Sequence, residues 1–427
     1  MISLKIILLA TFFTFLNPLI LFPQQDATRK IAVEEIKLYN EIRRSLGMSN
    51  RILNNDYTIK QFLGFENNEE LFKDKNIDNI FYSIYSTVKS FLGNYREALQ
   101  DYALSKKLCK IEISENDSLY MSRLVQTDAI ETISRMADSV RIVMINEAHH
   151  MPRHRILTTQ LLSLLYAKGY RYFCAETLSN SDTLRDENLN ERKYPVIGTG
   201  FYTLEPLYGD LVRQALKTGF KVVPYEIPNY SKGDREVIEA ENIYEIFKQD
   251  PKAKVIVHCG YSHITPTWMA GEFKRISGIR PLTIDQTEMA EEYSPEYCNE
   301  YYQAACKMDL LDKPSVFIDS SGKTSLMYGK LYDVVVFNPM TKYIYGRPDW
   351  MVMGGYRKVF NLKIFDLNDV KFIQAIYSNE DTELAIPVDQ IIVNNNNPVL
   401  YLPAGSYILK FFDDKGDIIS SKSINID

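Results

Sequence analysis

The fold of this 427-residue chain is decided by one stretch of its sequence, RIVMINEAHH at residues 141–150. Its first half is apolar and β-branched, which is typical of a buried strand. Polar residues follow at once, at Asn146, Glu147 and His149. An amphipathic stretch over 155–167 then predicts a helix. We therefore expect a strand that delivers polar side chains to the turn before a helix.

The same alternation continues to about residue 320. Further strand-like runs occur at 170–175, 220–225, 254–257 and 281–284. Helical patterns occur at 206–216, 234–247 and 268–276. Strands that alternate with helices predict an α/β fold with a parallel sheet, flanking helices and right-handed crossovers. The long polar segment 177–203 interrupts this rhythm and predicts a lid or binding loop.

The flanking regions have other patterns, and a chain of this length is expected to hold two or three domains. Residues 26–125 show helical periodicity and predict a helical cap. Short strand candidates at 362–365, 371–375, 390–393, 399–402 and 407–412 predict a small all-β sandwich. The predicted ranges are a signal peptide at 1–25, a helical region at 26–125, an α/β domain at 126–345 and a β-sandwich-like module at 346–427.

The amino-terminal segment has the pattern of an export signal. A short cationic start, Met1–Lys5, precedes an apolar run over Ile6–Phe22, and the sequence turns polar at Pro23. This favours a cleaved secretory signal over an uncleaved anchor, and hence a periplasmic or secreted protein. No later run of about 18 apolar residues occurs, so no transmembrane span is expected after signal removal.

Charge and cysteine content restrict the chemistry further. The net charge is −6 and no basic run is present, so nucleic acid is not an expected partner. Five cysteines, an odd number, exclude a full disulfide framework. Cys298 and Cys306 could pair if the protein is exported. Cys174 and Cys259 lie in apolar runs and are expected to be buried thiols.

Ionisable residues stand where the predicted strands end. They are Glu147 and His149, Glu176, Glu226, His263 and Asp285. Ligands of open α/β sheets bind at the carboxyl edge of the strands, so we expect a functional site there. Glu147 and His149 are two apart and can face the same way, although Glu147 could merely cap a helix.

The remaining candidates have competing interpretations. Glu176 follows an apolar run, and a buried carboxylate there needs a partner. His150 and His154 are four apart and could bind a metal or be exposed. His258 lies within a strand and is predicted to be a satisfied core histidine, whereas His263 follows a glycine that lets the chain turn sharply.

Several of these residues resemble a known superfamily over about residues 138–285. EAH at 147–149, followed by a helix and Glu176, resembles the ChaN-like pattern. GYSH at 260–263 matches the Gly-x-x-His of ChaN and Tiki proteins, and Arg235-Glu236 resembles the Arg-Asp of a helix in erythromycin esterases. This chain departs from those patterns at Asn146, His150, Glu236 and Gly260.

The resemblance implies water-activating hydrolysis of an ester or peptide substrate. It implies His149 as general base, Glu147 or Glu176 as its orienting acid, and His263 as the group that polarises the carbonyl. No Gly-x-Ser-x-Gly elbow is present, which disfavours a serine nucleophile. Substrate binding is assigned to Arg235, Glu226 and Tyr261.

Two alternatives remain open. The first is a divalent metal, Zn, Mn or Fe, bound by Glu147, His149, Glu176 and His263. The second is uptake of haem or iron without catalysis, which the histidines together with Tyr225 and Tyr261 would suit. A small molecule or a peptide is the expected partner in the hydrolytic interpretation.

Overall fold

A computed structural model of the chain describes residues 25–48, 54–73, 77–184, 187–226, 234–324, 331–393 and 398–427. Two compact units are present, and each is described by itself. The predicted signal peptide lies outside the described residues, apart from its last residue. Compact units do not show which segments fold independently, so the four predicted domain ranges stay predictions.

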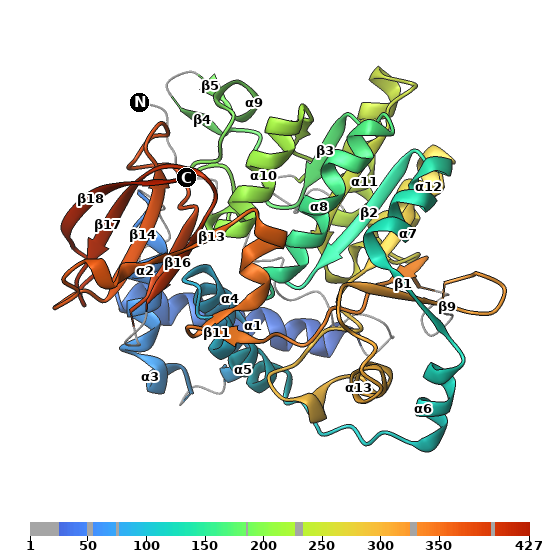
Figure 1. Ribbon diagram of the computed structural model, residues 1–427, viewed down its shortest axis with the longest axis horizontal. Helices are drawn as coiled ribbons and strands as arrows, with labels where there is room; N and C mark the ends of the chain where they lie inside the picture. Colours follow the sequence, from blue (N-terminus) through green and yellow to red (C-terminus); the bar gives the residue numbers. More distant parts are fainter. Residues whose placement is uncertain are drawn as a thin grey trace. The chain divides into compact units, whose positions relative to one another are not determined.

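The first unit contains residues 109–194 and 211–341 and is built on a six-stranded sheet. Its strands are β2 (Ile142–Glu147), β3 (Tyr172–Ala175), β6 (Lys221–Val223), β7 (Val255–Gly260), β8 (Leu282–Asp285) and β10 (Val334–Val335). Their order in space is β10-β8-β2-β7-β3-β6, so β7 lies between β2 and β3. Strands β2 and β3 are labelled in Figure 1. Every neighbouring pair is parallel, which confirms the predicted fold class.

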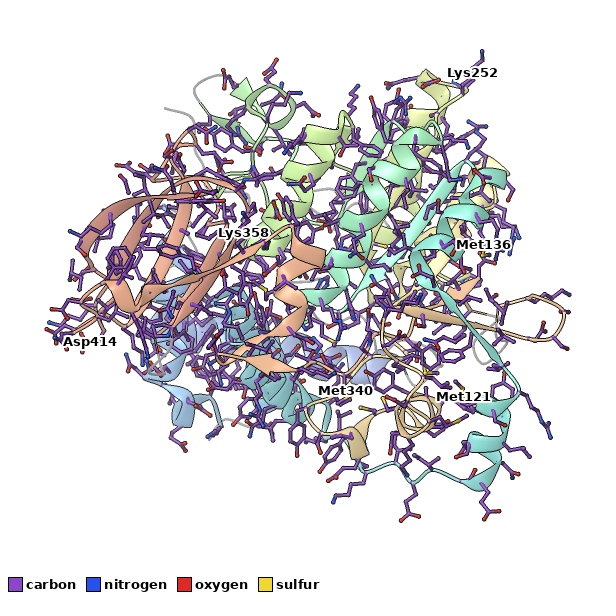
Figure 2. All side chains as sticks on the ribbon, viewed as in Figure 1. Met121, Met136, Lys252, Met340, Lys358 and Asp414 are labelled. Carbon is purple, nitrogen blue, oxygen red and sulfur yellow. The ribbon has the colours of Figure 1, made fainter. Side chains whose placement is uncertain are left out.

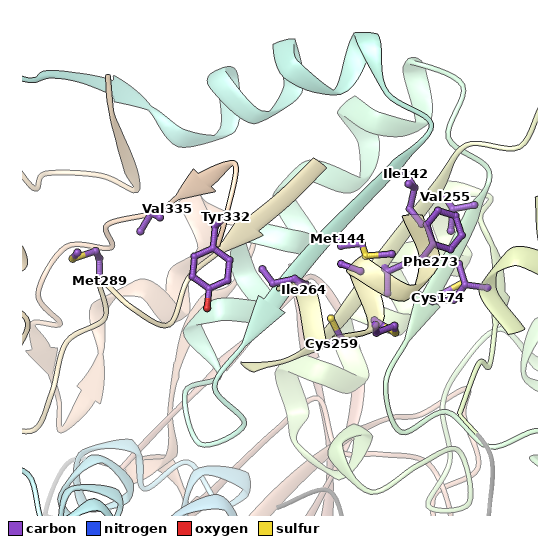
Figure 3. Packing of buried hydrophobic residues seen from close by; sticks show 14 of the residues in the cluster. Ile142, Met144, Cys174, Val255, Cys259, Ile264, Phe273, Met289, Tyr332 and Val335 are labelled. Atoms are coloured by element: carbon purple, nitrogen blue, oxygen red, sulfur yellow. The ribbon is translucent and has the colours of Figure 1, made fainter. Parts of the chain in front are cut away.

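Helices cover both faces of this sheet. They are α7 (Ala129–Met136), α8 (Arg153–Ala167), α10 (Pro206–Thr218), α11 (Arg235–Gln249) and α12 (Met269–Ser277). Ile142 and Met144 of β2 share a core with Phe273 and other residues of α11 and α12 (Figure 3). Val143 and Ile145 point to the opposite face and are fully buried as well. Two covered faces explain the continuous apolar run of β2.

Smaller elements complete the chain around the sheet. Outside it lie α6 (Glu115–Ser122), α13 (Glu300–Lys307) and the antiparallel pair β1 (Val125–Asp128) and β9 (Ser315–Ile318). The predicted loop 177–203 carries β4 (Thr183–Leu184), β5 (Glu187–Asn188) and α9 (Leu189–Arg192) in this unit. Its residues from 195 onward, with the 3-10 turn η3 (Tyr202–Leu204), belong to the second unit. Its role as a lid stays a prediction.

The cysteines are free thiols. Cys174 and Cys259 lie among apolar side chains, as predicted (Figure 3). Burial raises the pKa of both thiols. Cys298 and Cys306 are also free, so the disulfide considered for them is not formed in this structure.

The second unit contains residues up to 108 together with 195–210 and 342–427. Its helices are α1 (Gln25–Ser45), α2 (Tyr57–Glu66), α3 (Glu69–Lys73), α4 (Asp78–Phe91) and α5 (Tyr95–Lys106). Phe62 of α2 meets Phe372 edge to face, with ring centroids 5.9 Å apart. Phe412 belongs to the same core. The helical region and the carboxy-terminal strands therefore share one apolar core.

The carboxy-terminal strands are antiparallel. A four-stranded sheet has the order β15 (Asp389–Ile392), β14 (Phe372–Tyr377), β17 (Gly405–Phe412), β18 (Ile418–Ile426). β13 (Lys358–Asn361) pairs with β16 (Val399–Leu402), and β11 (Tyr343–Ile344) with β12 (Arg347–Pro348). The predicted strand at 362–365 is wrong, because the Asn361 side chain accepts a hydrogen bond from the Lys363 N–H and begins a 3-10 turn, η9 (Leu362–Ile364).

Charged residues mark the turns between elements. Lys252, at the turn between α11 and β7, and Asp414, at the turn between β17 and β18, are exposed (Figure 2). Among the described residues, no helix combines the length and the apolar character needed to pass through a bilayer.

Candidate functional site

Three neighbouring strands bring the candidate residues to one edge of the sheet. Glu147 ends β2 opposite Gly260, which ends β7. Glu176 directly follows β3, and its N–H donates to the carbonyl of His258 in β7 at 2.9 Å. His263 lies in the 3-10 turn η5 (Tyr261–Ile264) that follows β7. Parallel strands end at a common edge, which explains why residues far apart in sequence meet there.

The first group, the Glu147 cluster, consists of Glu147, His149, Arg155 and His258. Arg155 donates to both carboxylate oxygens of Glu147, at 2.7 Å from Nε and 2.8 Å from Nη2. His149 Nδ1 lies 3.0 Å from Oε1, and His258 Nε2 lies 2.9 Å from Oε2. All four side chains are almost completely buried. These contacts use the four lone-pair positions that a carboxylate offers.

Protonation in the Glu147 cluster follows from these contacts. Burial opposes ionisation of Glu147, but the Arg155 guanidinium and the hydrogen bonds from both histidines hold its pKa well below the ordinary value. An ionised carboxylate only accepts, so His149 Nδ1 donates, and in the neutral imidazole the lone pair is then on Nε2. His258 likewise donates from Nε2, and its Nδ1 lies 3.1 Å from the Thr158 hydroxyl.

Gly260 lies where His149 approaches Glu176. A Cβ added at this position would lie 2.6 Å from His149 Nε2 and 2.9 Å from Glu176 Oε2. The Gly260 N–H also donates to Glu176 Oε2. Only glycine permits this close approach of backbone, imidazole and carboxylate. His149 Nε2 therefore faces a point that is also bordered by the Glu176 carboxylate.

The second group, the Arg235 cluster, consists of Glu176, Glu226, Arg235, Glu236, Glu239 and His263. Arg235 Nη2 donates to Glu176 at 3.0 Å and to Glu226 at 2.8 Å, and its Nε donates to Glu239 at 2.6 Å. Burial raises the pKa of Glu226, and it raises that of Glu239 to about 8. Burial opposes ionisation of Glu176 too, but His263, His149 and Arg235 lower its pKa to about 2. One guanidinium thus serves three carboxylates.

His263 connects several acids of the Arg235 cluster. Its Nδ1 lies 2.8 Å from Glu236 Oε2 and 3.9 Å from Glu239 Oε2, and its Nε2 lies 3.7 Å from Glu176 Oε1. Burial disfavours the charged imidazolium, but Glu236 foremost, and Glu176 after it, raise the pKa of His263 to about 9.

Two residues beside the site have a left-handed backbone. Thr177 has φ +78°, which is unusual for a β-branched residue, and its N–H donates to the Glu226 carboxylate. Tyr261 has φ +37°, and the planes of its ring and of the His149 imidazole are 89° apart at 5.1 Å between centroids. Strained conformations of this kind cluster at functional sites.

The other candidates have local partners. His154 is fully buried, and its Nδ1 accepts from the Ala148 N–H at 3.0 Å. Burial lowers the pKa of His154 to about 3. His150 Nδ1 lies 3.4 Å from the Tyr261 hydroxyl. Asp285 accepts from Asn146 at 2.7 Å and from the Glu288 N–H at 3.0 Å, so it orders the turn after β8.

Of the four residues considered for a metal from the sequence, Glu147 is already fully occupied by hydrogen bonds. Glu147 has no lone pair left to offer, since Arg155, His149 and His258 use all four positions. Among the described residues, a different group has donor atoms all within 4.8 Å of one another, namely Glu236, Glu239 and His263. An oxygen- and nitrogen-donor set of this kind suits a divalent transition metal.

Sequence reasoning did not identify four residues of these clusters as site residues, namely Arg155, Glu236, Glu239 and His258. Arg155 begins the predicted helix over 155–167 but had no predicted role, and Glu236 was noted only within the family resemblance. The contact of His258 with Glu147 depends on strand pairing. Glu239 had a local signal, because it lies four residues after Arg235 on one helix face, where opposite charges pair.

Comparisons with known proteins give little to add to this geometry. No family model matches the chain, and no curated protein matches it. A solved structure of the type III effector HopBA1 matches with 17% sequence identity and a TM-score of 0.30, over 40% of this chain and 88% of that chain. A likeness this low supports no argument about activity.

Proposed function

We propose that this chain is a hydrolase of ester or peptide bonds, in the erythromycin esterase, ChaN and Tiki-like superfamily, with His149 as its general base. The observation that carries the proposal is the 3.0 Å contact between Glu147 Oε1 and His149 Nδ1, which orients the ring so that Nε2 is the nitrogen not held by Glu147. Motif order along residues 147–263 supports the superfamily assignment.

Each step of the proposed reaction uses side chains of the two clusters. His149 Nε2 takes a proton from water as the water oxygen bonds to the carbonyl carbon of the substrate. The ionised Glu147, fixed by Arg155, stabilises the imidazolium that forms. His263 donates to the developing oxyanion. His149 then returns the proton to the leaving oxygen or nitrogen as the old bond breaks, and no step passes through a metal.

The test compares two neighbouring histidines. His149→Gln is expected to lower the hydrolysis rate by about 100- to 10,000-fold, the usual contribution of a general base. His150→Gln serves as the matched control, since His150 is the adjacent buried histidine and its Nδ1 lies 3.4 Å from the Tyr261 hydroxyl. A panel of p-nitrophenyl esters and fluorogenic peptides gives the readout. If His149→Gln keeps its activity and His150→Gln loses it, His150 is the general base and the assignment of His149 is wrong.

Haem binding is the competing outcome of the same measurement. If no substrate is hydrolysed, and added haem gives a Soret band that His149→Gln abolishes, the uptake alternative replaces hydrolysis.

Export belongs to the proposal as well. It rests on the cationic start at Met1–Lys5 and the apolar run over Ile6–Phe22. Mass spectrometry of the exported protein is expected to show a mature amino terminus near Pro23–Asp26. Recovery of the exported chain with Met1 in place would contradict it.

A further inference from the structure

We infer that Glu236, Glu239 and His263 form a binding site for one divalent transition-metal ion, separate from the Glu147–His149 pair. Glu236 and Glu239 lie three residues apart on α11 and so share one helix face. His263 reaches them from η5. One donor atom from each of the three side chains lies within 4.8 Å of the others.

The contacts around the three residues resemble the supporting shell of a metal site. A metal-binding histidine typically donates its other ring N–H to a carboxylate. His263 Nδ1 faces Glu236 and Glu239, whereas Nε2 faces Glu176 Oε1 at 3.7 Å. The arrangement therefore leaves Nδ1 as the ligand atom, with Nε2 on the side of Glu176 but beyond hydrogen-bond distance of it.

Hydrogen bonds from neighbouring groups also orient the carboxylates of Glu236 and Glu239. Arg235 Nε donates to Glu239 Oε1 at 2.6 Å, which leaves Oε2 on the side of His263. The Met269 N–H donates to Glu236 Oε2 at 3.0 Å. The second oxygen of Glu236, Oε1, is buried and has no hydrogen-bond partner. A buried carboxylate oxygen without a donor is costly unless a cation or another donor reaches it.

The donor set also selects the class of ion. Two carboxylates and one imidazole suit Zn²⁺, Mn²⁺ or Fe²⁺, whereas Mg²⁺ and Ca²⁺ prefer oxygen ligands alone. Three protein ligands leave at least one position for water. Binding breaks the hydrogen bond between Nδ1 and Glu236 Oε2, and the displaced proton leaves to solvent.

Metal binding to the full chain tests the inference directly. After dialysis against a chelator, the protein is titrated with Zn²⁺ by calorimetry and its zinc content is measured. We expect one ion per chain, and binding weakened at least about 100-fold in Glu239→Gln and in His263→Gln, since even the loss of supporting residues costs 10- to 100-fold. Glu226→Gln is the matched control, because Glu226 also contacts Arg235 but is not a ligand.

Two results would overturn the inference. One is a wild-type chain that takes up no ion. The other is one ion per chain, bound with unchanged affinity, in both Glu239→Gln and His263→Gln. If either variant fails to fold, the test uses the absorption spectrum of the wild-type chain with added Co²⁺. A spectrum that shows only the d–d bands of hydrated Co²⁺ would contradict the site.

His149→Gln separates this inference from the proposed hydrolysis. We expect it to lose hydrolysis and to keep the ion, because His149 is not a ligand here. Loss of the ion in His149→Gln would instead favour the ligand set that contains His149 and would overturn the inference. A wild-type chain that binds the ion but hydrolyses no substrate would contradict the proposed hydrolysis and leave the metal site unaffected.

Discussion

The Glu147 cluster and the Arg235 cluster are built from the same kinds of side chain in opposite proportions. In the first, one carboxylate receives one guanidinium and two imidazoles. In the second, one guanidinium is divided among Glu176, Glu226 and Glu239. Both lie almost fully buried at the edge of the same sheet.

This difference in proportion determines the protonation of the acids. Glu147 has every lone pair occupied, and its pKa is held well below the ordinary value although burial opposes this. Burial raises the pKa of Glu226 and Glu239, because Arg235 cannot neutralise all its neighbours. The first cluster is a fixed ion pair that orients a base, whereas the second has more acids than Arg235 can neutralise, so they tend to hold a proton and could take up a cation in its place.

The largest effect is expected from Glu147→Gln. The amide leaves Arg155 buried without its charged partner, so the free energy of unfolding should fall by about 3–5 kcal/mol. Urea unfolding at neutral pH measures the loss. Glu245→Gln is the matched control, since Glu245 is half exposed and pairs only with Lys248. It should stay within about 0.5 kcal/mol of the wild type. A fall of less than about 1 kcal/mol in the unfolding free energy of Glu147→Gln would contradict the view that Glu147 is more strongly paired than the acids of the Arg235 cluster.

Gly260→Ala tests the point where the clusters touch. The added Cβ would press on His149 of one cluster and Glu176 of the other, and such overpacking typically costs about 1–3 kcal/mol. Hydrolysis should fall as well, because His149 must move. Gly198→Ala is the control, since nothing lies within 4 Å of its added Cβ. Equal stability and activity of the two variants would show that the approach is not as close as described.

His154 gives a pH test beside the Glu147 cluster. Burial lowers its pKa to about 3, with Arg153, Arg155 and His258 opposing the attraction of Glu147. A histidine with a lowered folded pKa contributes stability above its unfolded pKa of 6.5 and loses it as pH falls. Between pH 6.5 and 5 the loss should be about 2 kcal/mol.

The difference between the wild type and His154→Asn isolates this contribution. Unfolding curves at pH 7.5 and 5 should show a smaller acid loss in the variant. An equal loss in both proteins would mean that His154 is protonated in the folded state.

Much of this arrangement could be predicted from the sequence, because it depends on local patterns. The apolar run before Glu147 predicts a buried strand, and the alternation that follows predicts the parallel sheet and its carboxyl edge. The ion pair of Arg235 with Glu239 is readable from spacing on one helix. The 3-10 turn at Leu362 was missed because the side chain of Asn361 competes with the strand pattern.

The partners of Glu147 depend on features that the sequence does not carry. His258 reaches it because β7 inserts between β2 and β3, although β7 follows both in sequence. Strand order is a tertiary property, so His258 could only be interpreted as a core histidine. Its burial is confirmed, and its ring nitrogens bond Glu147 and Thr158.

The smallest effect is expected from Glu226→Gln, the counterpart of Glu147→Gln in the Arg235 cluster. Arg235 keeps Glu176 and Glu239, and the amide oxygen can still accept from the Thr177 N–H. The raised pKa of Glu226 means that the folded state disfavours its ionised form, which the neutral amide avoids. Stability should therefore change by no more than about 1 kcal/mol.

The pH dependence of the two variants should have opposite signs. The raised pKa of Glu226 contributes stability that is present below its unfolded pKa of 4.5 and lost as pH rises. Glu226→Gln lacks this loss, so its free energy of unfolding should rise relative to that of the wild type between pH 4 and 7. The lowered pKa of Glu147 contributes stability only above its unfolded pKa of 4.5. The free energy of unfolding of Glu147→Gln should therefore fall relative to that of the wild type between pH 4 and 7. Unfolding free energies of both variants at the two pH values decide the matter. Slopes of the same sign would mean that the two carboxylates carry the same charge, and the contrast between the clusters would fail.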